Sequence, residues 1–161
     1  MMLRDNYYVV AYLTGILFVV SPVWAKDIAL PDCDFVVEMP ASATVERIQS
    51  QYITFYQAKA TAGRAFLQVE CLPYKSNQEE VRAMALSHLN AIGGFGSAFK
   101  VTSPDGYEHR FYKKLPEGVV TYVAKIYVGN KSTFIATGGT LSSDFPSDEI
   151  AEFHKSIRRR K

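Results

Sequence analysis

Alternating hydrophobic and polar positions, the pattern of half-buried β-strands, recur along most of the chain after residue 32. We expect strands at 33–39, 48–59, 64–73, 98–103, 107–115, 119–128 and 132–140. Turn-forming residues separate several of these runs, at 61–63, 104–106, 116–118 and 129–131. Strands joined by such short turns favour a mainly antiparallel sheet.

Two other segments follow the 3.6-residue period of an α-helix. The first begins after Ser76 or Asn77, with glutamates at the spacing of a capping box, and ends at Gly93-Gly94. The second is expected from about Pro146 to Arg159. The order β-β-β-α-β-β-β-β-α predicts one α+β domain, in which two helices flank a central, mainly antiparallel sheet of about six or seven strands as an α/β/α sandwich.

The first 25 residues have the pattern of a secretory signal peptide. Arg4 precedes an uncharged stretch at 7–20, which is followed by the helix breaker Pro22 and by Val23-Trp24-Ala25. A membrane-spanning helix needs about 20 apolar residues, so this shorter stretch favours cleavage near Ala25 over an uncleaved anchor. The predicted organisation is therefore a signal peptide at 1–25 and a single domain at 26–161, periplasmic or secreted.

Composition limits the classes of function without selecting one. Of the 161 residues, 48% are hydrophobic and 21% are charged, as in ordinary globular domains. The net charge of +2 is too small to indicate nucleic acid or another acidic polymer as a partner.

The two cysteines, Cys33 and Cys71, are an even number in a chain with an export signal, which favours one disulfide. Around each of them, hydrophobic residues alternate with polar ones, so both side chains are expected on the core side of neighbouring strands. The alternative is a pair of buried free thiols. Two sulfur atoms alone make a poor metal site.

No motif in the sequence indicates catalysis, a cofactor or a metal. The glycine-rich segment 93–97 follows a helix, whereas a phosphate-binding loop precedes one. The histidines lack metal-ligand spacing, and no GxSxG nucleophile motif is present. We therefore assign no catalytic, cofactor-binding or metal-binding residue, and the least implausible enzymatic set is His109, Tyr107 and Glu108.

The run Arg158, Arg159, Arg160 and Lys161 is a candidate contact with an anionic surface, such as lipid headgroups or an acidic protein. At about 1 kcal/mol for each charge, it would give at most weak contact with a membrane. The alternative is structural, because cations at a helix C-terminus complement the macrodipole.

The order of these elements resembles that of PsbP-like domains, including bacterial exported proteins of the DcrB type. The resemblance rests on the opening CDFVVEMPAS, the hairpin QYITFYQAKATAGRAFLQVECLPY, the helix NQEEVRAMALSHLNAI, and the later segments DGYEHRFYKKL, YVAKIYVGNKSTFIATGG and EIAEFHKSIR. It covers nearly all of the chain after the signal peptide. It implies an α/β/α sandwich and an accessory or binding role, as in photosystem subunits and a nuclear-import factor. No functional residue carries over, because the family shares no site motif.

These observations lead to the hypothesis of an exported, non-enzymatic domain that binds a protein partner or stabilises a complex of the cell envelope. One version is an immunity or inhibitor protein that blocks a toxin or a hydrolase. A second hypothesis is a small-molecule carrier with a pocket between sheet and helix, lined by aromatic residues such as Tyr52, Phe66 and Tyr122. A third is an enzyme whose residues converge only in three dimensions.

Overall fold

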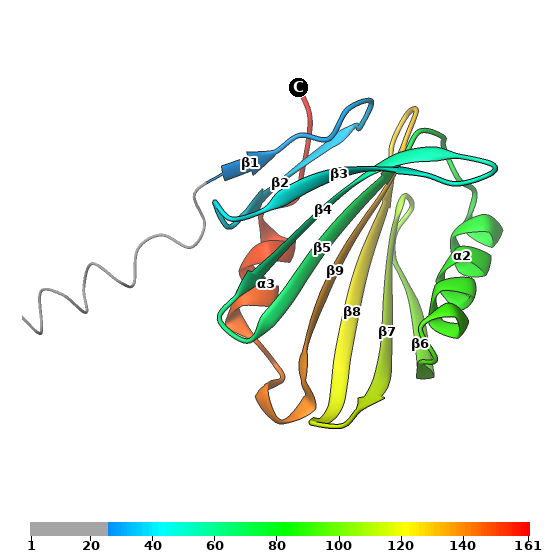
Figure 1. Cartoon of the computed structure of the whole chain (residues 1–161). Coiled ribbons are helices and arrows are strands. Elements are labelled where there is room, and N and C mark those ends of the chain that lie inside the picture. The colour runs from blue at the N-terminus through cyan, green and yellow to red at the C-terminus, as the bar shows by residue number, and fades with distance from the viewer. Residues whose placement is uncertain (1–25) are drawn as a thin grey trace, which may run out of the picture.

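The computed structural model describes residues 26–161, so the proposed signal peptide at 1–25 lies outside the described residues (Figure 1). A strongly twisted seven-stranded sheet has the order β3-β4-β5-β9-β8-β7-β6, and every neighbouring pair is antiparallel. Its strands are β3 (Thr44–Gln49), β4 (Thr54–Ala62), β5 (Ala65–Leu72), β6 (Phe95–Ser103), β7 (Gly106–Leu115), β8 (Gly118–Val128) and β9 (Thr133–Leu141). The expected antiparallel α+β architecture is confirmed.

A second, three-stranded sheet lies beside the first and has the order β1-β2-β10. Its strands are β1 (Lys26–Ile28), β2 (Phe35–Met39) and β10 (Arg158–Arg159). Both β1 and β10 pair antiparallel with β2, so the first and last described segments lie on either side of β2 (Figure 1).

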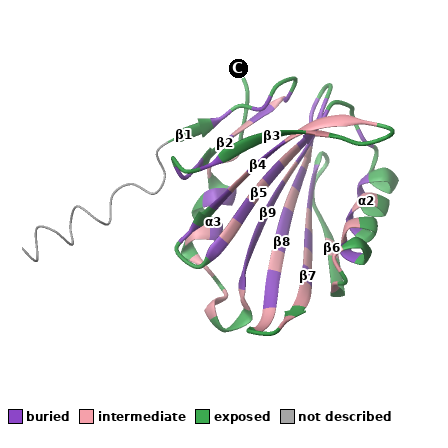
Figure 2. Ribbon diagram, in the orientation of Figure 1, coloured by how far each residue is buried: buried purple, intermediate pink, exposed green. Residues whose placement is uncertain are grey.

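One face of the large sheet packs against the helix α3 (Asp148–Lys155) and against β2. Because side chains alternate along a strand, Leu67 and Val69 of β5 and Ala136 of β9 all point to this face. Ile150 and Phe153 of α3 are buried against them, within the larger of the hydrophobic clusters. Figure 2 shows this burial along the strands.

The opposite face packs against the helix α2 (Gln78–Ala91). Asn77 caps this helix by accepting a hydrogen bond from the backbone N–H of Glu80, and the Glu80 carboxylate accepts one from the N–H of Asn77, which completes the expected capping box. Only Val81, Ala85 and Leu89 of α2 are buried. The helix therefore covers this face through one narrow stripe, and Figure 2 shows most of the rest of it exposed.

The strand expected at 48–59 is wrong, because a turn at Ser50 divides this segment between β3 and β4. The Ser50 hydroxyl accepts a hydrogen bond from the N–H of Ile53, and the Ser50 N–H donates to the Ile53 carbonyl at 2.9 Å. The two strands pair with each other from Thr44↔Lys59 to Gln49↔Thr54. The hydrophobic residues on both sides of the turn had concealed a hairpin.

The helix expected from Pro146 to Arg159 is also shorter than predicted. Ser147 caps α3 as anticipated, but the helix ends at Lys155. The next residues turn back along β2, where Arg158 pairs with Val36 as part of β10. The basic run consequently lies outside the helix, and the macrodipole explanation for it is wrong.

Cys33 and Cys71 form a disulfide, as the sequence predicted, with their Cα atoms 5.9 Å apart. Cys71 belongs to β5, whereas Cys33 precedes β2 and lies outside any strand. The bond therefore joins the two sheets and does not link neighbouring strands as expected. Both residues lie in the cluster beneath α3.

Candidate functional site

A cleft of about 360 Å³ lies between α2 and the large sheet, and we call it the α2 cleft. Strands β5, β9, β8 and β7 form its floor, which includes the aliphatic residues Ala124, Ile126 and Ile135. Met84 and Ala85 belong to the wall that α2 contributes. Its volume lies within the range of small-molecule sites, at the lower end.

The alternation of the strands explains why this floor combines apolar and polar groups. Gln68 and Glu70 of β5 point away from the core beneath α3, because Leu67, Val69 and Cys71 point into it. The residues that are polar in the sequence pattern therefore lie on the face that α2 covers only in part.

Glu70 is the carboxylate of this floor, and two amide side chains hold it. Nε2 of Gln57, on β4, donates a hydrogen bond to Oε1 of Glu70 at 2.6 Å. Nε2 of Gln68 donates to the same oxygen at 2.9 Å. Gln57 is buried, so the carboxylate has a fixed orientation.

His109 lies at the other side of the floor, on β7, and is buried between aromatic rings. Its ring centroid is 4.9 Å from that of Phe111, which in turn stacks on Tyr122 at 5.0 Å. The hydroxyl of Ser97 is 2.8 Å from Nε2 of His109. Burial, with a smaller contribution from nearby His88, lowers the pKa of His109, so its imidazole is neutral at pH 7.

The three residues suggested for an enzyme do not converge. Tyr107 and His109 point toward α2, whereas Glu108 lies between them on β7 and points to the opposite face. There Glu108 approaches Arg110 at 3.9 Å. The carboxylate of the floor, Glu70, lies in the same cross-strand row as Tyr107 but three strands away, a separation of roughly 14 Å. Among the described residues, Tyr107, Glu108 and His109 therefore do not form a paired histidine and carboxylate.

The aromatic residues suggested for a carrier lie only partly in this region. Phe66 and Tyr122 line a hollow that shares His88 and Thr137 with the α2 cleft. Tyr52 lies in the turn between β3 and β4 and is 90% exposed, so it lines neither space.

The described residues offer no metal centre and no membrane-spanning helix. Within 26–161, no group of three or more histidine, cysteine, aspartate or glutamate side chains is arranged to hold a metal ion. In the same range, no helix has both the length and the apolar character needed to cross a bilayer.

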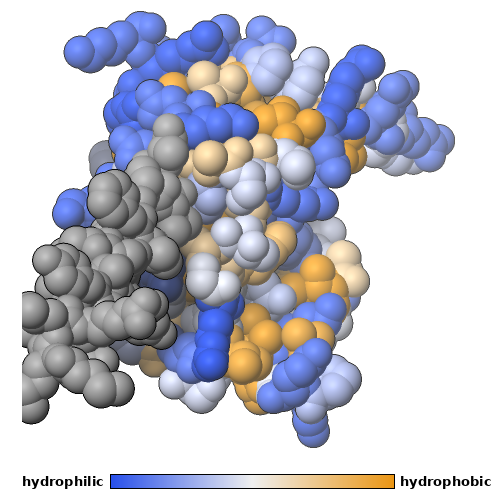
Figure 3. All heavy atoms as spheres, turned by 60° about the vertical axis from the view of Figure 1, so that its left-hand side comes forward, coloured by the Kyte–Doolittle hydropathy of each residue, from blue (hydrophilic) through white to orange (hydrophobic). Residues whose placement is uncertain are grey.

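Hydrophobic residues also reach the surface, but they are dispersed. Figure 3 shows, on the face turned forward there, separate hydrophobic patches between hydrophilic residues. The exposed large hydrophobic residues of the described chain are Val45, Tyr52, Tyr74, Leu86, Phe95 and Val101, which come from edge strands, α2 and loops. The α2 cleft is therefore a better candidate for a binding site than any of these single positions.

Comparison with solved structures identifies the architecture. The solution structure of the cyanobacterial PsbP (CyanoP) from Synechocystis sp. PCC 6803 matches with a TM-score of 0.59 over 88% of this chain and 95% of that one, at 6% identity. The chain has a PsbP-like fold. A crystal structure from Bacteroides thetaiotaomicron VPI-5482 matches less well, with a TM-score of 0.48 at 10% identity over 86% of this chain and 49% of that one. No family model and no curated protein sequence matches, so the likeness is one of fold.

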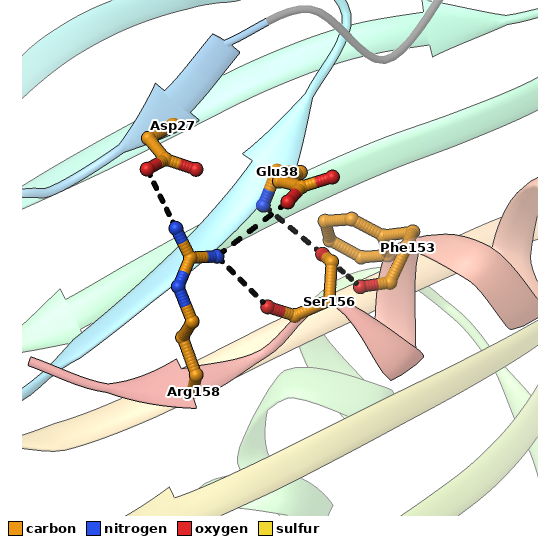
Figure 4. Close-up of polar contacts among 5 residues, drawn as sticks. All are labelled: Asp27, Glu38, Phe153, Ser156 and Arg158. Atoms are coloured by element: carbon orange, nitrogen blue, oxygen red, sulfur yellow. Dashed lines mark hydrogen bonds and ion pairs between the residues drawn. The ribbon is translucent and has the colours of Figure 1, made fainter.

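Within this PsbP-like fold, the basic run at the C-terminus is partly engaged (Figure 4). Nη2 of Arg158 lies 2.6 Å from a carboxylate oxygen of Asp27, and Nη1 lies 3.8 Å from one of Glu38. Arg159 lies 3.8 Å from Asp105, and its guanidinium stacks over the ring of Phe35. These contacts connect β10 to β1, to β2 and to the turn between β6 and β7.

Arg160 and Lys161 are exposed beyond these contacts. These two residues follow β10, whereas Arg158 and Arg159 belong to it. The contact of the basic run with an anionic surface stays a prediction, and it depends mainly on the side chains of Arg160 and Lys161.

Glu70, Gln57 and Gln68 were not singled out from the sequence. The alternation along β5 predicted that Glu70 points to the face opposite to that of Cys71. It did not show that an amide side chain from another strand would donate a hydrogen bond to this carboxylate. That contact depends on the register Gln57↔Glu70 between β4 and β5, which the loose sequence pattern leaves open.

Proposed function

We propose that this chain is an exported, non-enzymatic accessory domain of the cell envelope that acts by binding. The observation that carries the proposal is the α2 cleft, in which a largely apolar floor lies beside a few polar groups. The PsbP-like fold supports an accessory role as a resemblance of architecture.

Two further features support a location outside the cytoplasm. The Cys33–Cys71 disulfide is typical of oxidising compartments. The segment at 1–25 has the charge and hydropathy pattern of a signal peptide, so the exported protein should start at Lys26. Intact-mass analysis of the natural protein measures this starting residue directly.

The leading form of the proposal is a protein partner in the envelope that contacts the molecule at the α2 cleft. The test is retention of partners from an envelope extract by the wild-type protein and by two variants of α2. Ala91→Trp places a bulky ring at the rim of the cleft, whereas Ala83→Trp places the same ring on an exposed part of the helix that does not line it.

We expect one partner to be retained by the wild type and by Ala83→Trp and lost by Ala91→Trp. A partner that tolerates both substitutions would show that the protein binds through another surface. If no protein is retained, the partner role is wrong and the second candidate takes its place.

That second candidate is a small-molecule carrier. The volume of the cleft and its aliphatic floor favour it, because sites for small molecules are concave and mostly apolar, with few polar groups. A metabolite that copurifies with the wild type but not with Ala91→Trp would support it.

A further inference from the structure

Glu70 is the one carboxylate among the described residues that line the α2 cleft, and it forms no ion pair. The hydrogen bonds from Gln57 and Gln68 both reach Oε1, and no described residue donates one to Oε2. One carboxylate oxygen is therefore held in a fixed direction with its hydrogen-bonding capacity unused.

The surroundings of Glu70 are largely apolar. Phe55 and Leu72 line the cleft near it, and Ile135 is its direct neighbour across the β5–β9 pair. A charge beside such a surface interacts more strongly with a partner than it would in bulk water. The site can thus distinguish a cation from a neutral group on an otherwise apolar molecule.

Lys59 of β4 lies on the same face as Glu70, beside Gln57, but it pairs with Glu46 at 3.9 Å. The basic residue of the adjoining hollow is farther from Glu70. Tyr107 of β7 lies in the same cross-strand row as Glu70, three strands away. Lys113 lies a further six residues along β7 from Tyr107. The separation is on the order of 20 Å, beyond a Debye length at physiological ionic strength. Lys113 consequently does not neutralise Glu70.

We propose that the α2 cleft binds a small organic amine, whose ammonium group donates to Oε2 of Glu70 and whose apolar body lies along the floor. This inference rests on the small-molecule form of the binding role, the second candidate above, and names the chemistry of the ligand. The ammonium supplies the missing donors, and the hydrocarbon part covers Ile126 and Ile135.

A peptide chain fits this floor less well than a small molecule. β5 is an inner strand, and its backbone groups are already paired with β4 and β9. A peptide lying across the aliphatic floor would lose water from its own N–H and C=O groups and find few partners there. A ligand with its polarity concentrated at one end avoids this cost.

The test compares three probes with the same hydrocarbon chain: hexylamine, 1-hexanol and hexanoate. Each is titrated into the disulfide-bonded protein, and the amide chemical shifts of β5, β9 and α2 are followed by NMR. We expect hexylamine to shift these resonances and to bind about tenfold or more tightly than 1-hexanol, with hexanoate the weakest.

The matched variants are Glu70→Gln and Glu108→Gln. Glu70→Gln keeps an oxygen that can accept from Gln57 and Gln68, so the fold is preserved while the charge is removed. Glu108→Gln removes the same charge from the opposite face of the sheet. We expect the preference for hexylamine to disappear in Glu70→Gln and to persist in Glu108→Gln.

The outcomes separate this inference from the proposed function. Equal binding of hexylamine and 1-hexanol, or an undiminished preference in Glu70→Gln, would overturn the assignment of an amine and leave the binding role intact. If no probe perturbs the cleft, the small-molecule site itself is wrong. The partner assay with Ala91→Trp then decides the proposed function independently.

Discussion

Asp34 illustrates how a single side chain connects the two sheets. Its Oδ2 accepts hydrogen bonds from the N–H groups of Lys131 and Ser132 and from the Ser132 hydroxyl, at 2.8–2.9 Å. Burial alone raises the pKa of this carboxyl, but the hydrogen bonds outweigh burial and lower it below its ordinary value. The ionised carboxylate therefore fixes the turn between β8 and β9 to the residues that precede β2.

His154 is a second residue whose environment sets a property of the whole protein. It is buried in α3, and Nε2 donates a hydrogen bond to the carbonyl of Ala136 at 3.0 Å. Burial lowers the pKa of His154 to about 4, aided by the charge of Lys125 and opposed by this hydrogen bond. The folded protein thus keeps the imidazole neutral.

We predict that this histidine makes the protein less stable in mild acid. The unfolded chain takes up a proton near pH 6.5, whereas the folded chain does so only near pH 4. The contribution of His154 is therefore fully present above about pH 6.5 and is lost as the pH falls from there to about 4, by about 3 kcal/mol. Urea unfolding at pH 7 and at pH 4.5 measures the loss.

The control is His154→Gln, which can still donate to the Ala136 carbonyl but does not titrate. Its free energy of unfolding should fall less between the two pH values than that of the wild type. An equal fall in both proteins would mean that other groups, such as His109, whose pKa is also lowered by burial, account for the acid sensitivity.

At the scale of elements, the sequence predicted those whose signals are local. The capping box at Asn77 and Glu80 and the glycines at 93 and 94 gave α2 nearly its observed bounds. Six of the seven expected strands correspond to observed strands within a few residues, because turn residues separate them.

The elements that sequence missed depend on distant partners. β1 and β10 are short and exist because each pairs with β2, which is far from β10 in the sequence. The α2 cleft could not be predicted for the same reason. Its carboxylate, amides and aliphatic floor come from α2 and five strands, and their convergence depends on the sheet order.

The C-terminal strand β10 provides a test of such a non-local element. A variant that ends at Ile157 loses the pairing of β10 with β2 and the hydrogen bond from the N–H of Arg160 to the Asp34 carbonyl at 2.7 Å. We expect the free energy of unfolding to fall by about 2 kcal/mol, since each backbone hydrogen bond contributes about 0.5–1.5 kcal/mol. Urea denaturation measures the change.

Arg158→Ala separates the backbone pairing from the charges. Figure 4 shows the Arg158 guanidinium between Asp27 and Glu38, but this contact is exposed, so its removal should change stability little. Were Arg158→Ala as destabilising as the truncation, the ion pairs and not the strand would hold this end of the chain.

For the whole molecule, the two faces of the large sheet have different roles. The face toward α3 and β2 is closed, carries the larger hydrophobic cluster and contains the disulfide. The face toward α2 carries two smaller clusters and the cleft. Stability is thus concentrated on one side of the sheet, which leaves the other side partly open for binding.

This division predicts a local effect of the Cys33–Cys71 bond. Its cysteines are 38 residues apart, and by the chain-entropy model such a bond contributes about 4 kcal/mol. The double variant Cys33→Ala, Cys71→Ala should lose stability up to that amount, and reducing agent should affect only the wild type. The Asp34 hydrogen bonds remain, so the variant should still fold at neutral pH.

Hydrogen exchange should locate the loss in the closed layer. Without the bond, amides of β2 and of α3 are expected to exchange faster, because they belong to the layer that the disulfide ties to β5. Amides of α2, β7 and β8 should keep their protection, since their contacts lie on the other face. A uniform increase across both faces would show that the sheet unfolds as one cooperative unit, with the small sheet and α3 inseparable from the side that carries the cleft.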